Sequence, residues 1–298
     1  MRKTTLFRKL ILDEEILLLP GSYDALSAKI IEQAGFRATV VGGYAASASI
    51  LGKPDVSLLT LTEMVERTRY IADAVEIPVF ADGDTGHGNV TNAARTVRDF
   101  ERAGVAGLFL EDQVFPKRCG HMEGKQVITA EEMVAKLKAA TDAREDPDFV
   151  IMARTDALAV YGIDEAIDRG NKYMDAGADL IFVEAPTSEQ DMIRMNREIK
   201  GPTFASMIEG GKTPWFTPKQ LQAMGFSVAA YGLSMVYAAS WAMRSLAKEL
   251  FDTGTTEGFL DRMISFNDFN KLVGLDQIRS REARFYKDIA NSGSKGGQ

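Results

Sequence analysis

The sequence predicts an α/β fold: a single (β/α)8 barrel of the TIM type followed by a C-terminal helical extension. Eight short apolar segments alternate with helical stretches over roughly the first 250 residues. The segments are apolar throughout, as in a parallel sheet that is covered on both faces. No Pro-, Gly- or Ser-rich linker divides the chain. Eight βα units in about 250 residues therefore fit one barrel domain.

Four of the predicted strands follow a glycine that ends a helix, since Gly accepts the left-handed backbone found at helix C-termini. They lie within EQAGFRATVVGG (32–43), ERAGVAGLFLED (101–112), DAGADLIFVEA (175–185) and AMGFSVAAYG (223–232). The other four are entered through or near a proline, in LLLPGSYD (17–24), IPVFADGD (77–84), DPDFVIMARTD (146–156) and GPTFASM (201–207). Amphipathic periodicity predicts helices between the strands, over 61–75, 91–103, 129–144 and 164–176. A doubly wound sheet is the alternative, but no GxGxxG fingerprint follows the first strand.

The barrel is expected to occupy residues 1–250, and the helical extension residues 251–298 with a disordered tail, SGSKGGQ. Beyond residue 250 the pattern is helical without strands, which is typical of an appendage or an oligomer contact. Met- and aromatic-rich stretches such as MVYAASWAMRSL (235–246) favour core or subunit interface over a cofactor site.

The composition excludes several classes of protein. The 298 residues include 35 Lys and Arg and 42 Asp and Glu, a net charge of −7, which argues against a nucleic-acid partner. One cysteine excludes an intrachain disulfide and a Cys-rich zinc site, and two histidines disfavour a multi-His metal site. The N-terminus lacks a signal-peptide cleavage site, and no apolar run approaches the ~20 residues of a membrane helix. We expect a cytoplasmic enzyme without a membrane partner.

In a (β/α)8 barrel the chemistry lies at the C-terminal ends of the strands, and polar or glycine residues follow every predicted strand. In strand order they are Ser22 and Asp24; Gly42, Gly43 and Tyr44; Asp82 and Asp84; Glu111 and Asp112; Arg154 and Asp156; Glu184; Ser206 and Glu209; and Ser234. Any one of them could instead cap a helix, but their convergence favours a site.

The segment ADGDTGHGN (81–89) suggests a metal site. In a strand, residues i and i+2 point the same way, so Asp82 and Asp84 could face one hard cation. Glu111, from the next strand, would add a third oxygen ligand. Few protein oxygens together with water and substrate suit Mg²⁺ or Mn²⁺ better than Ca²⁺. The alternative is a capped turn with solvated acids, and the pattern favours the metal.

The only cysteine, Cys119, lies in PKRCGHMEGK (116–125), next to Lys117, Arg118 and His121. Cationic neighbours favour the thiolate and lower the pKa of a cysteine, which suits a proton donor or a nucleophile near neutral pH. The glycines allow movement, and the loop is long enough to act as a lid. The alternative is a small buried core residue.

Arg154, at the end of VIMART, is expected to point into the barrel mouth. A fixed guanidinium there can hold a carboxylate through two hydrogen bonds. The alternative is a salt bridge to Asp156 or Glu184.

Five segments together resemble the isocitrate lyase/phosphoenolpyruvate mutase superfamily: LPGSYDALSAKIIEQAGF, ADGDTGHGN, LEDQVFPKRCGH, DPDFVIMARTDA and EGGKTPWFT. The resemblance covers roughly residues 5–250. Its most specific piece, KRCGH, marks the carbon–carbon lyase branch and some relatives. The resemblance implies a (β/α)8 barrel, Mg²⁺, a mobile cysteine loop and a homotetramer, a dimer of dimers with helices swapped between subunits.

The resemblance also implies roles at matching positions. Asp84 is similar to the direct Mg²⁺ ligand of the family, with Asp82 and Glu111 acting through water. Gly42 and Gly43 resemble the backbone site that binds the α-carboxylate of a small carboxylate substrate.

The reacting groups follow from the same resemblance. Arg154 would help to bind the α-carboxylate, and Cys119 resembles the general acid, tuned by Lys117 and His121. The base that removes the hydroxyl proton is not evident from the motifs, and Tyr44 is the candidate. The remaining residues expected around the substrate are Gly120, Glu184, Ser206, Glu209 and Ser234.

The implied activity is that of a carbon–carbon oxo-acid lyase. A 2-hydroxy acid would chelate Mg²⁺ through its C1 carboxylate and C2 oxygen, and the metal and Arg154 would stabilise the C2 oxyanion. Cleavage of the C2–C3 bond would give a 2-keto acid such as pyruvate and a carboxylate enolate, which Cys119 would protonate on carbon.

Two positions bear on the substrate. Tyr237 stands where methylisocitrate lyases usually carry an arginine for the third carboxylate, and Ser206 stands where Asn is common. A tricarboxylate would lose a charged partner worth about a few kcal/mol. This favours a dicarboxylate, 2,3-dimethylmalate or another 2-alkylmalate, and the petal-death-protein branch also carries Tyr there.

Four alternatives stay open. 2-Methylisocitrate is the close alternative substrate, and an oxaloacetate hydrolase would use the same metal site. Carboxyphosphonoenolpyruvate phosphonomutases share KRCGH and EGGKTPW, so the motifs alone do not separate P–C from C–C chemistry. A non-enzymatic barrel relic is disfavoured by the intact acid pair, the cysteine loop and Arg154.

Overall fold

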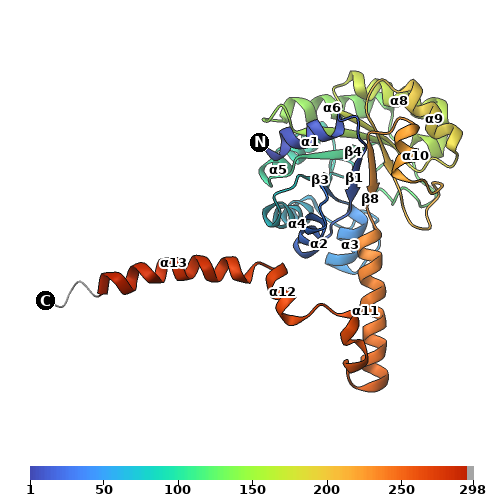
Figure 1. The fold of residues 1–298 in the computed structure, drawn as a ribbon. Coiled ribbons are helices and arrows are strands. Elements are labelled where there is room, and N and C mark those ends of the chain that lie inside the picture. The colour runs from blue at the N-terminus through green and yellow to red at the C-terminus, as the bar shows by residue number, and fades with distance from the viewer. Residues whose placement is uncertain (294–298) are drawn as a thin grey trace. The chain divides into compact units, whose positions relative to one another are not determined.

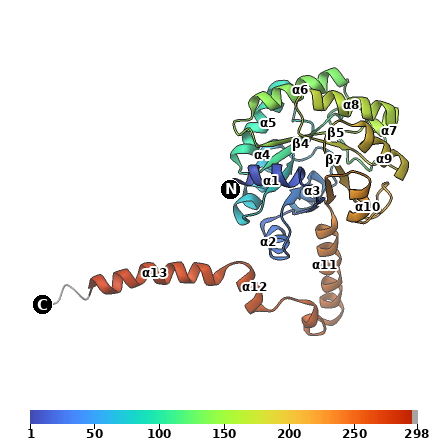
Figure 2. The same ribbon diagram turned by 45° about the horizontal axis from the view of Figure 1, so that its top comes forward.

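The structure, a computed structural model, describes the backbone of residues 1–293 and the side chains of residues 1–286. Eight parallel strands form one sheet in the order β1-β8-β7-β6-β5-β4-β3-β2. A parallel bridge between Gly21 and Val40 brings β2 next to β1, so the sheet closes into a barrel ringed by helices (Figures 1 and 2). The strands are β1 (Leu17–Pro20), β2 (Thr39–Val41), β3 (Val79–Asp82), β4 (Gly107–Glu111), β5 (Val150–Thr155), β6 (Leu180–Val183), β7 (Thr203–Ser206) and β8 (Val228–Tyr231).

The predicted (β/α)8 barrel is confirmed, with one strand inside each of the eight predicted segments. The four helices predicted by periodicity are α4 (Leu61–Ala74), α5 (Val90–Arg102), α6 (Ala130–Ala143) and α8 (Ile163–Asp175), each within one residue of its expected bounds. The remaining helices of the barrel are α1 (Lys3–Ile11), α2 (Ala25–Gln33), α3 (Gly43–Leu51), α7 (Ala157–Tyr161), α9 (Glu189–Glu198) and α10 (Pro218–Ala223). Local sequence sets the starts: Thr60 and Glu63 form a capping box on α4, which satisfies two free N–H groups of its first turn.

Alternate residues of the strands pack into two cores, because successive side chains of a strand point to opposite faces. One core lies between strands and helices. The other fills the barrel and includes Phe7, Leu10 and Ile11 of α1. Phe7 stacks on Phe80 of β3 with ring centroids 5.1 Å apart. Apolar packing therefore fills the barrel interior, and the polar side chains gather at the C-terminal strand ends.

The chain divides into two compact units, residues 1–238 and 239–298. The sequence placed the boundary at 250/251, whereas the structural boundary falls inside α11 (Ser234–Thr253), because this unbroken helix contributes residues to both units. The second unit continues with the short 3-10 helix η1 (Glu257–Arg262), α12 (Phe266–Leu272) and α13 (Leu275–Gly293). Of the predicted tail, residues 294–298 lie outside the described residues. Within the described part of the chain, no helix has the combination of length and apolar character that crossing a membrane requires.

Candidate active site

A cavity of about 100 Å³ lies at the C-terminal ends of the strands. Ten of the predicted site residues line it: Gly42, Gly43, Tyr44, Asp82, Cys119, Gly120, His121, Arg154, Glu184 and Ser206. Its apolar lining comes from Val40, Phe109, Phe182, Phe204, Ile208, Ala230 and Leu233. The cavity thus combines a charged group of side chains with apolar walls.

Asp82 ends β3 and orders the backbone around it. Its Oδ2 accepts a hydrogen bond from the Gly43 N–H at 2.8 Å, and its Oδ1 accepts one from the Asp84 N–H at 2.9 Å. Asp84 lies beyond the strand with a left-handed φ of +48°. Asp84 therefore lies in a tight turn held by the Asp82 side chain, and not in the strand from which its direction was predicted. The two carboxylates still converge, because a β-carbon on Gly43 would lie 3.0 Å from Asp82 Oδ2 and 3.5 Å from Asp84 Oδ1. One of the two predicted carboxylate-binding N–H groups, that of Gly43, is already used by Asp82.

Lys117 lies behind the cavity lining, with its side chain only 2% exposed. Its Nζ is 2.7 Å from Asp84 Oδ1 and 2.8 Å from Asp55 Oδ2. Asp55, which was not predicted as a site residue, lines the cavity and is buried. Its segment GKPDVS reads as an ordinary turn, so no local signal marks it.

Glu111 is fully buried at the end of β4, and neither of its carboxylate oxygens has a hydrogen-bond partner. Arg154 Nη1 lies 3.3 Å from Glu111 Oε2. Burial raises the pKa of Glu111 well above its usual range, against the lowering effect of Arg154 and Lys117. Burial likewise raises the pKa of Asp84 to about 6, although Lys117 acts in the opposite direction.

These carboxylates fit a hard divalent cation. No group of three or more His, Cys, Asp or Glu side chains is assembled for a metal anywhere in the described part of the chain. The buried oxygens of Glu111 nevertheless have no hydrogen-bond partner, and Oε2 has only the ion pair with Arg154. Asp84 Oδ1 likewise has only the ion pair with Lys117. A divalent cation would give these buried oxygens a partner, and carboxylate oxygens are the donors that Mg²⁺ prefers.

Cys119 lies on the loop that connects β4 to α6, and the loop is anchored on both sides of the thiol. The Gln113 side chain bonds the backbone of Arg118 in both directions, at 2.8 and 3.0 Å. The Cys119 N–H donates to the Asp55 carbonyl at 3.3 Å. The thiol is half-buried and lines the cavity.

The prediction that cationic neighbours lower the pKa of Cys119 is wrong. Burial raises this pKa above its ordinary value of 9.0, and the Glu184 carboxylate adds to the rise, against the His121 N–H and Arg154. Lys117 instead pairs with Asp55 and Asp84, and Arg118 is exposed. The thiol is therefore neutral near pH 7, which is the state required of a proton donor.

His121 and Gly120 fix the other side of the cysteine loop. His121 Nδ1 accepts from the Lys212 N–H at 3.0 Å, and its Nε2 lies 3.2 Å from Glu184 Oε1. A β-carbon on Gly120 would lie 2.3 Å from Glu184 Cδ and 2.5 Å from Arg154 Nη2. Only glycine allows the loop backbone to approach this pair so closely.

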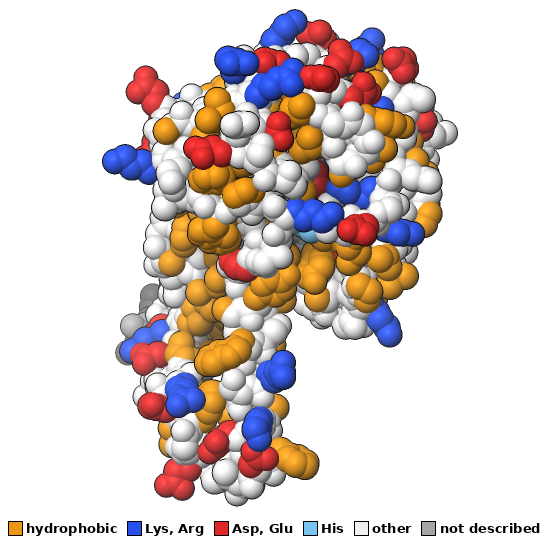
Figure 3. Space-filling model, turned by 90° about the vertical axis from the view of Figure 1, so that its right-hand side faces the viewer, with side chains coloured by type: hydrophobic (Ala, Val, Ile, Leu, Met, Phe, Trp, Pro, Cys, Tyr) orange, Lys and Arg blue, Asp and Glu red, His pale blue; other side chains and the backbone are white. Residues whose placement is uncertain are grey.

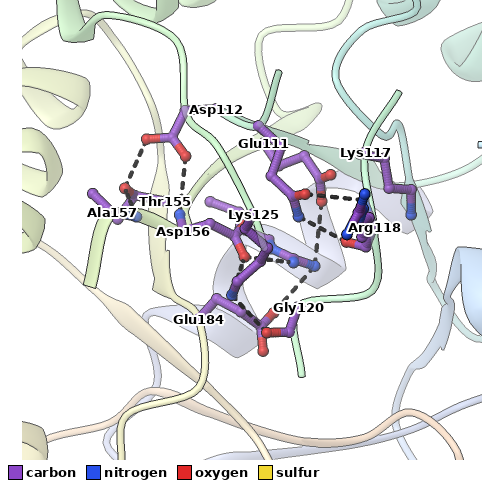
Figure 4. Close-up of polar contacts among 12 residues, drawn as sticks. Glu111, Asp112, Lys117, Arg118, Gly120, Lys125, Thr155, Asp156, Ala157 and Glu184 are labelled. Carbon is purple, nitrogen blue, oxygen red and sulfur yellow. Dashed lines mark hydrogen bonds and ion pairs between the residues drawn. The ribbon is translucent and has the colours of Figure 1, made fainter. Parts of the chain in front are cut away.

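Arg154 is held by three carboxylates. Its Nε and Nη2 donate to the two oxygens of Asp156 at 2.9 and 3.1 Å. Its Nη1 lies 3.1 Å from Glu184 Oε2, besides the contact with Glu111. The alternative from the sequence, a salt bridge to Asp156 or Glu184, is thus present, yet the guanidinium also lines the cavity as predicted. Figure 4 labels the three carboxylates, Glu111, Asp156 and Glu184, which lie in one group at the strand ends.

Five residues to which the sequence assigns a role in the site lie outside the cavity lining: Asp84, Glu111, Lys117, Glu209 and Ser234. Glu209 is exposed and accepts a hydrogen bond from Ser234 Oγ.

Tyr44, which lines the cavity, packs edge-on against Tyr237, with ring centroids 6.4 Å apart. Burial and the hydrogen bond with Tyr44 raise the pKa of Tyr237 to about 12.

Comparison with known proteins places these features in context. Residues 7–251 match the family described as phosphoenolpyruvate phosphomutase. The chain is 48% identical to 2,3-dimethylmalate lyase of Eubacterium barkeri, over 96% of this chain and 99% of the other. It is also 48% identical to a chloroplastic carboxyvinyl-carboxyphosphonate phosphorylmutase of Arabidopsis thaliana (98% and 87%), and 39% identical to a 2-methylisocitrate lyase of Aeropyrum pernix (95% and 91%).

Solved structures agree with the sequence matches. A crystal structure of 2,3-dimethylmalate lyase superposes with a TM-score of 0.90 at 33% identity, covering 95% of both chains. A phosphonopyruvate hydrolase in complex with oxalate and Mg²⁺ superposes with a TM-score of 0.87 at 30% identity, covering 96% of this chain and 100% of the other.

Proposed function

The chain belongs to the phosphoenolpyruvate phosphomutase family, within the isocitrate lyase/phosphoenolpyruvate mutase superfamily, and we propose that it is a Mg²⁺-dependent carbon–carbon lyase. Its substrate would be a 2-hydroxy dicarboxylate of the 2,3-dimethylmalate or 2-alkylmalate type. The products would be a 2-keto acid such as pyruvate and a carboxylic acid. The observation that carries the proposal is a neutral thiol, Cys119, in the same cavity as Arg154 and the start of α3.

The substrate's α-carboxylate would bind between Arg154 and the N-terminus of α3, which begins at Gly43. The first turn of a helix leaves N–H groups without intrahelical partners and attracts anions. Because Gly43 donates to Asp82, the following N–H groups of the turn would serve the carboxylate. Arg154 would offer it a guanidinium that is already fixed in place by Asp156.

Asp84 would hold the divalent cation, with Asp82 and Glu111 beside it. When bound, a Mg²⁺ or Mn²⁺ ion supplies Lewis-acid polarisation of the substrate's carboxylate and C2 oxygen. Lys117 holds Asp84 in place and opposes the rise that burial causes in its pKa. Cys119 would give its proton to the carbon that becomes the α-carbon of the released acid, and Tyr44 is the candidate acceptor for the hydroxyl proton.

The far wall of the cavity supports an alkyl-substituted dicarboxylate over a tricarboxylate. Ile208 and Leu233 line it, and they cluster with Tyr44. Tyr237, where the family's tricarboxylate lyases usually carry arginine, packs on Tyr44. An apolar wall suits a methyl group and leaves a third carboxylate without a charged partner.

A side-by-side assay tests the substrate. We expect Mg²⁺-dependent pyruvate release from 2,3-dimethylmalate in a coupled dehydrogenase assay, abolished by EDTA and restored by excess Mg²⁺ or Mn²⁺. 2-Methylisocitrate, oxaloacetate and carboxyphosphonoenolpyruvate should react more slowly. Pyruvate only from 2-methylisocitrate would establish the second candidate, which the 39% identity to a 2-methylisocitrate lyase supports. Conversion of carboxyphosphonoenolpyruvate alone would contradict the lyase.

We also propose that the chain forms a homotetramer, a dimer of dimers, through its C-terminal helices. Within residues 239–286, Phe259 is the only buried residue. Trp241, Met243 and Phe251 of α11 are 68%, 62% and 89% exposed, and Figure 3 shows apolar side chains among charged ones along this region. An apolar surface of this kind marks a protein contact. Light scattering should give a mass near four times 32.7 kDa; a monomer would contradict the proposal.

A further inference from the structure

The end of the cysteine loop carries a buried lysine with no role in the reaction proposed above. The side chain of Lys125 is only 2% exposed. Its Nζ lies 2.7 Å from Asp156 Oδ1 and donates to the Gly120 carbonyl at 2.5 Å. Figure 4 shows the Lys125 side chain pointing toward Gly120 and Asp156. The Lys125 ammonium thus connects the end of the loop to the residue that follows Cys119, and also connects the loop to the end of β5.

The anchor that Lys125 binds is rigid. The Asp156 N–H donates to Asp112 Oδ1 at 2.9 Å. The other oxygen of Asp112 accepts from Thr155 Oγ1 at 2.7 Å and from the Tyr173 hydroxyl at 2.8 Å. Arg169 adds an ion pair to the same oxygen at 3.0 Å. Every member of this network is buried, so Asp156 has a fixed position against which the loop can be held.

The loop itself has the means to move. Gly124 adopts a left-handed φ of +74° directly before Lys125, and Gly120 lies on the other side of His121. The backbone bond from the Met122 N–H to the Cys119 carbonyl at 2.9 Å closes a turn around Gly120. The contact of Lys125 with the Gly120 carbonyl ties this turn to the barrel immediately after the thiol.

We propose that Lys125 is a positioning residue that holds the cysteine loop closed on Asp156, and thereby places the Cys119 thiol over the cavity. The kinetic part of this inference rests on the proposed function, whereas the structural part does not. Without the ammonium, the Gly120 carbonyl loses its partner and the Asp156 carboxylate keeps only Arg154, so the loop loses the connection that Lys125 makes to the end of β5.

The only cysteine of the chain provides a direct test. We expect the rate of Cys119 alkylation by iodoacetamide, in the absence of substrate, to rise about tenfold or more in Lys125→Met, because local opening exposes the thiol. Lys125→Arg, which retains the charge, should restore much of the protection. The matched control is Lys138→Met, an exposed lysine on α6, which should react at the wild-type rate.

Equal alkylation rates in Lys125→Met and Lys138→Met would overturn the proposal. Circular dichroism first establishes that each variant is folded; if Lys125→Met is not, Lys125→Gln carries the same test with an uncharged donor. In the pyruvate assay, kcat of Lys125→Met should fall about tenfold while KM changes by less than about twofold, since the loop places the thiol and Arg154 binds the carboxylate. If Lys125→Met is alkylated faster but the wild type shows no turnover, the positioning role of Lys125 stands and the lyase proposal is rejected. If the wild type turns over but Lys125→Met is alkylated at the wild-type rate, the lyase proposal stands and the positioning role is rejected.

Discussion

Replacing Cys119 by alanine is expected to lower kcat for 2,3-dimethylmalate cleavage by about 10²–10⁴, the usual contribution of a positioned general acid. Burial raises the pKa of the thiol, so the group carries its proton at neutral pH and can deliver it to carbon. Alanine removes the proton donor but leaves Arg154 and the α3 N-terminus in place. Substrate binding, measured by calorimetry with Mg²⁺ present, should therefore change little.

The control for this substitution is Met122→Ala on the same loop. Met122 lines a second cavity on the other side of the loop and does not line the active-site cavity. The Met122→Ala variant should keep kcat within about twofold of the wild type, as expected for a substitution away from the reacting atoms. Cys119→Ser should remain impaired, because a hydroxyl is a far weaker acid than a thiol. Wild-type turnover in Cys119→Ala would reject the assignment of the proton donor.

The barrel could be predicted because its signals are local. Helix-ending glycines such as Gly104 and Gly177, which adopt φ of +83° and +102°, stand directly before apolar strands whose length and pattern are visible in the sequence. The side chains at the strand ends follow from the topology once the strands are placed. Ten of the predicted residues accordingly line one cavity.

The electrostatics of the site could not be predicted in the same way. Lys117 is two residues from Cys119, yet its partner Asp55 lies 62 positions away in the chain. Lys125 and Asp156 are separated by 31 positions. Sequence proximity suggested that Lys117 would act on the thiol, whereas the folded loop turns the ammonium toward two carboxylates. The ion-pair partners of these lysines depend on the directions of their side chains, and those directions are determined only when the loop packs on the barrel.

Arg154 is the residue on which the buried carboxylates of the site depend most. Glu111, Asp156 and Glu184 are 0%, 0% and 4% exposed at their side chains, and all three lie within 3.3 Å of the guanidinium. Asp156 also has Lys125, and Glu184 has His121. Removing Arg154 would leave Glu111 without the ion pair that it makes here, at the centre of the barrel mouth.

We therefore expect Arg154→Met to lower the free energy of unfolding by about 3–5 kcal/mol, the usual effect of removing one partner from a buried ion pair. Urea denaturation in EDTA measures this without a metal that could take over the charge. The free energy of unfolding of Arg154→Lys should lie between those of the wild type and Arg154→Met, because one ammonium cannot match the spacing of three carboxylates. Arg118→Met, an exposed arginine on the cysteine loop, is the control and should change stability by less than about 0.5 kcal/mol.

The pH dependence of this difference has a defined sign. Burial acts to raise the pKa of Glu184, but Arg154 and His121 together hold it below its ordinary value of 4.5. A carboxyl whose pKa is depressed on folding stabilises the protein above its ordinary pKa and loses that contribution as the pH falls through the folded value. The stability gap between wild type and Arg154→Met should therefore be widest near neutral pH and narrow below pH 4.5. A gap that grew on acidification would mean that the guanidinium does not hold this carboxylate in its ionised form.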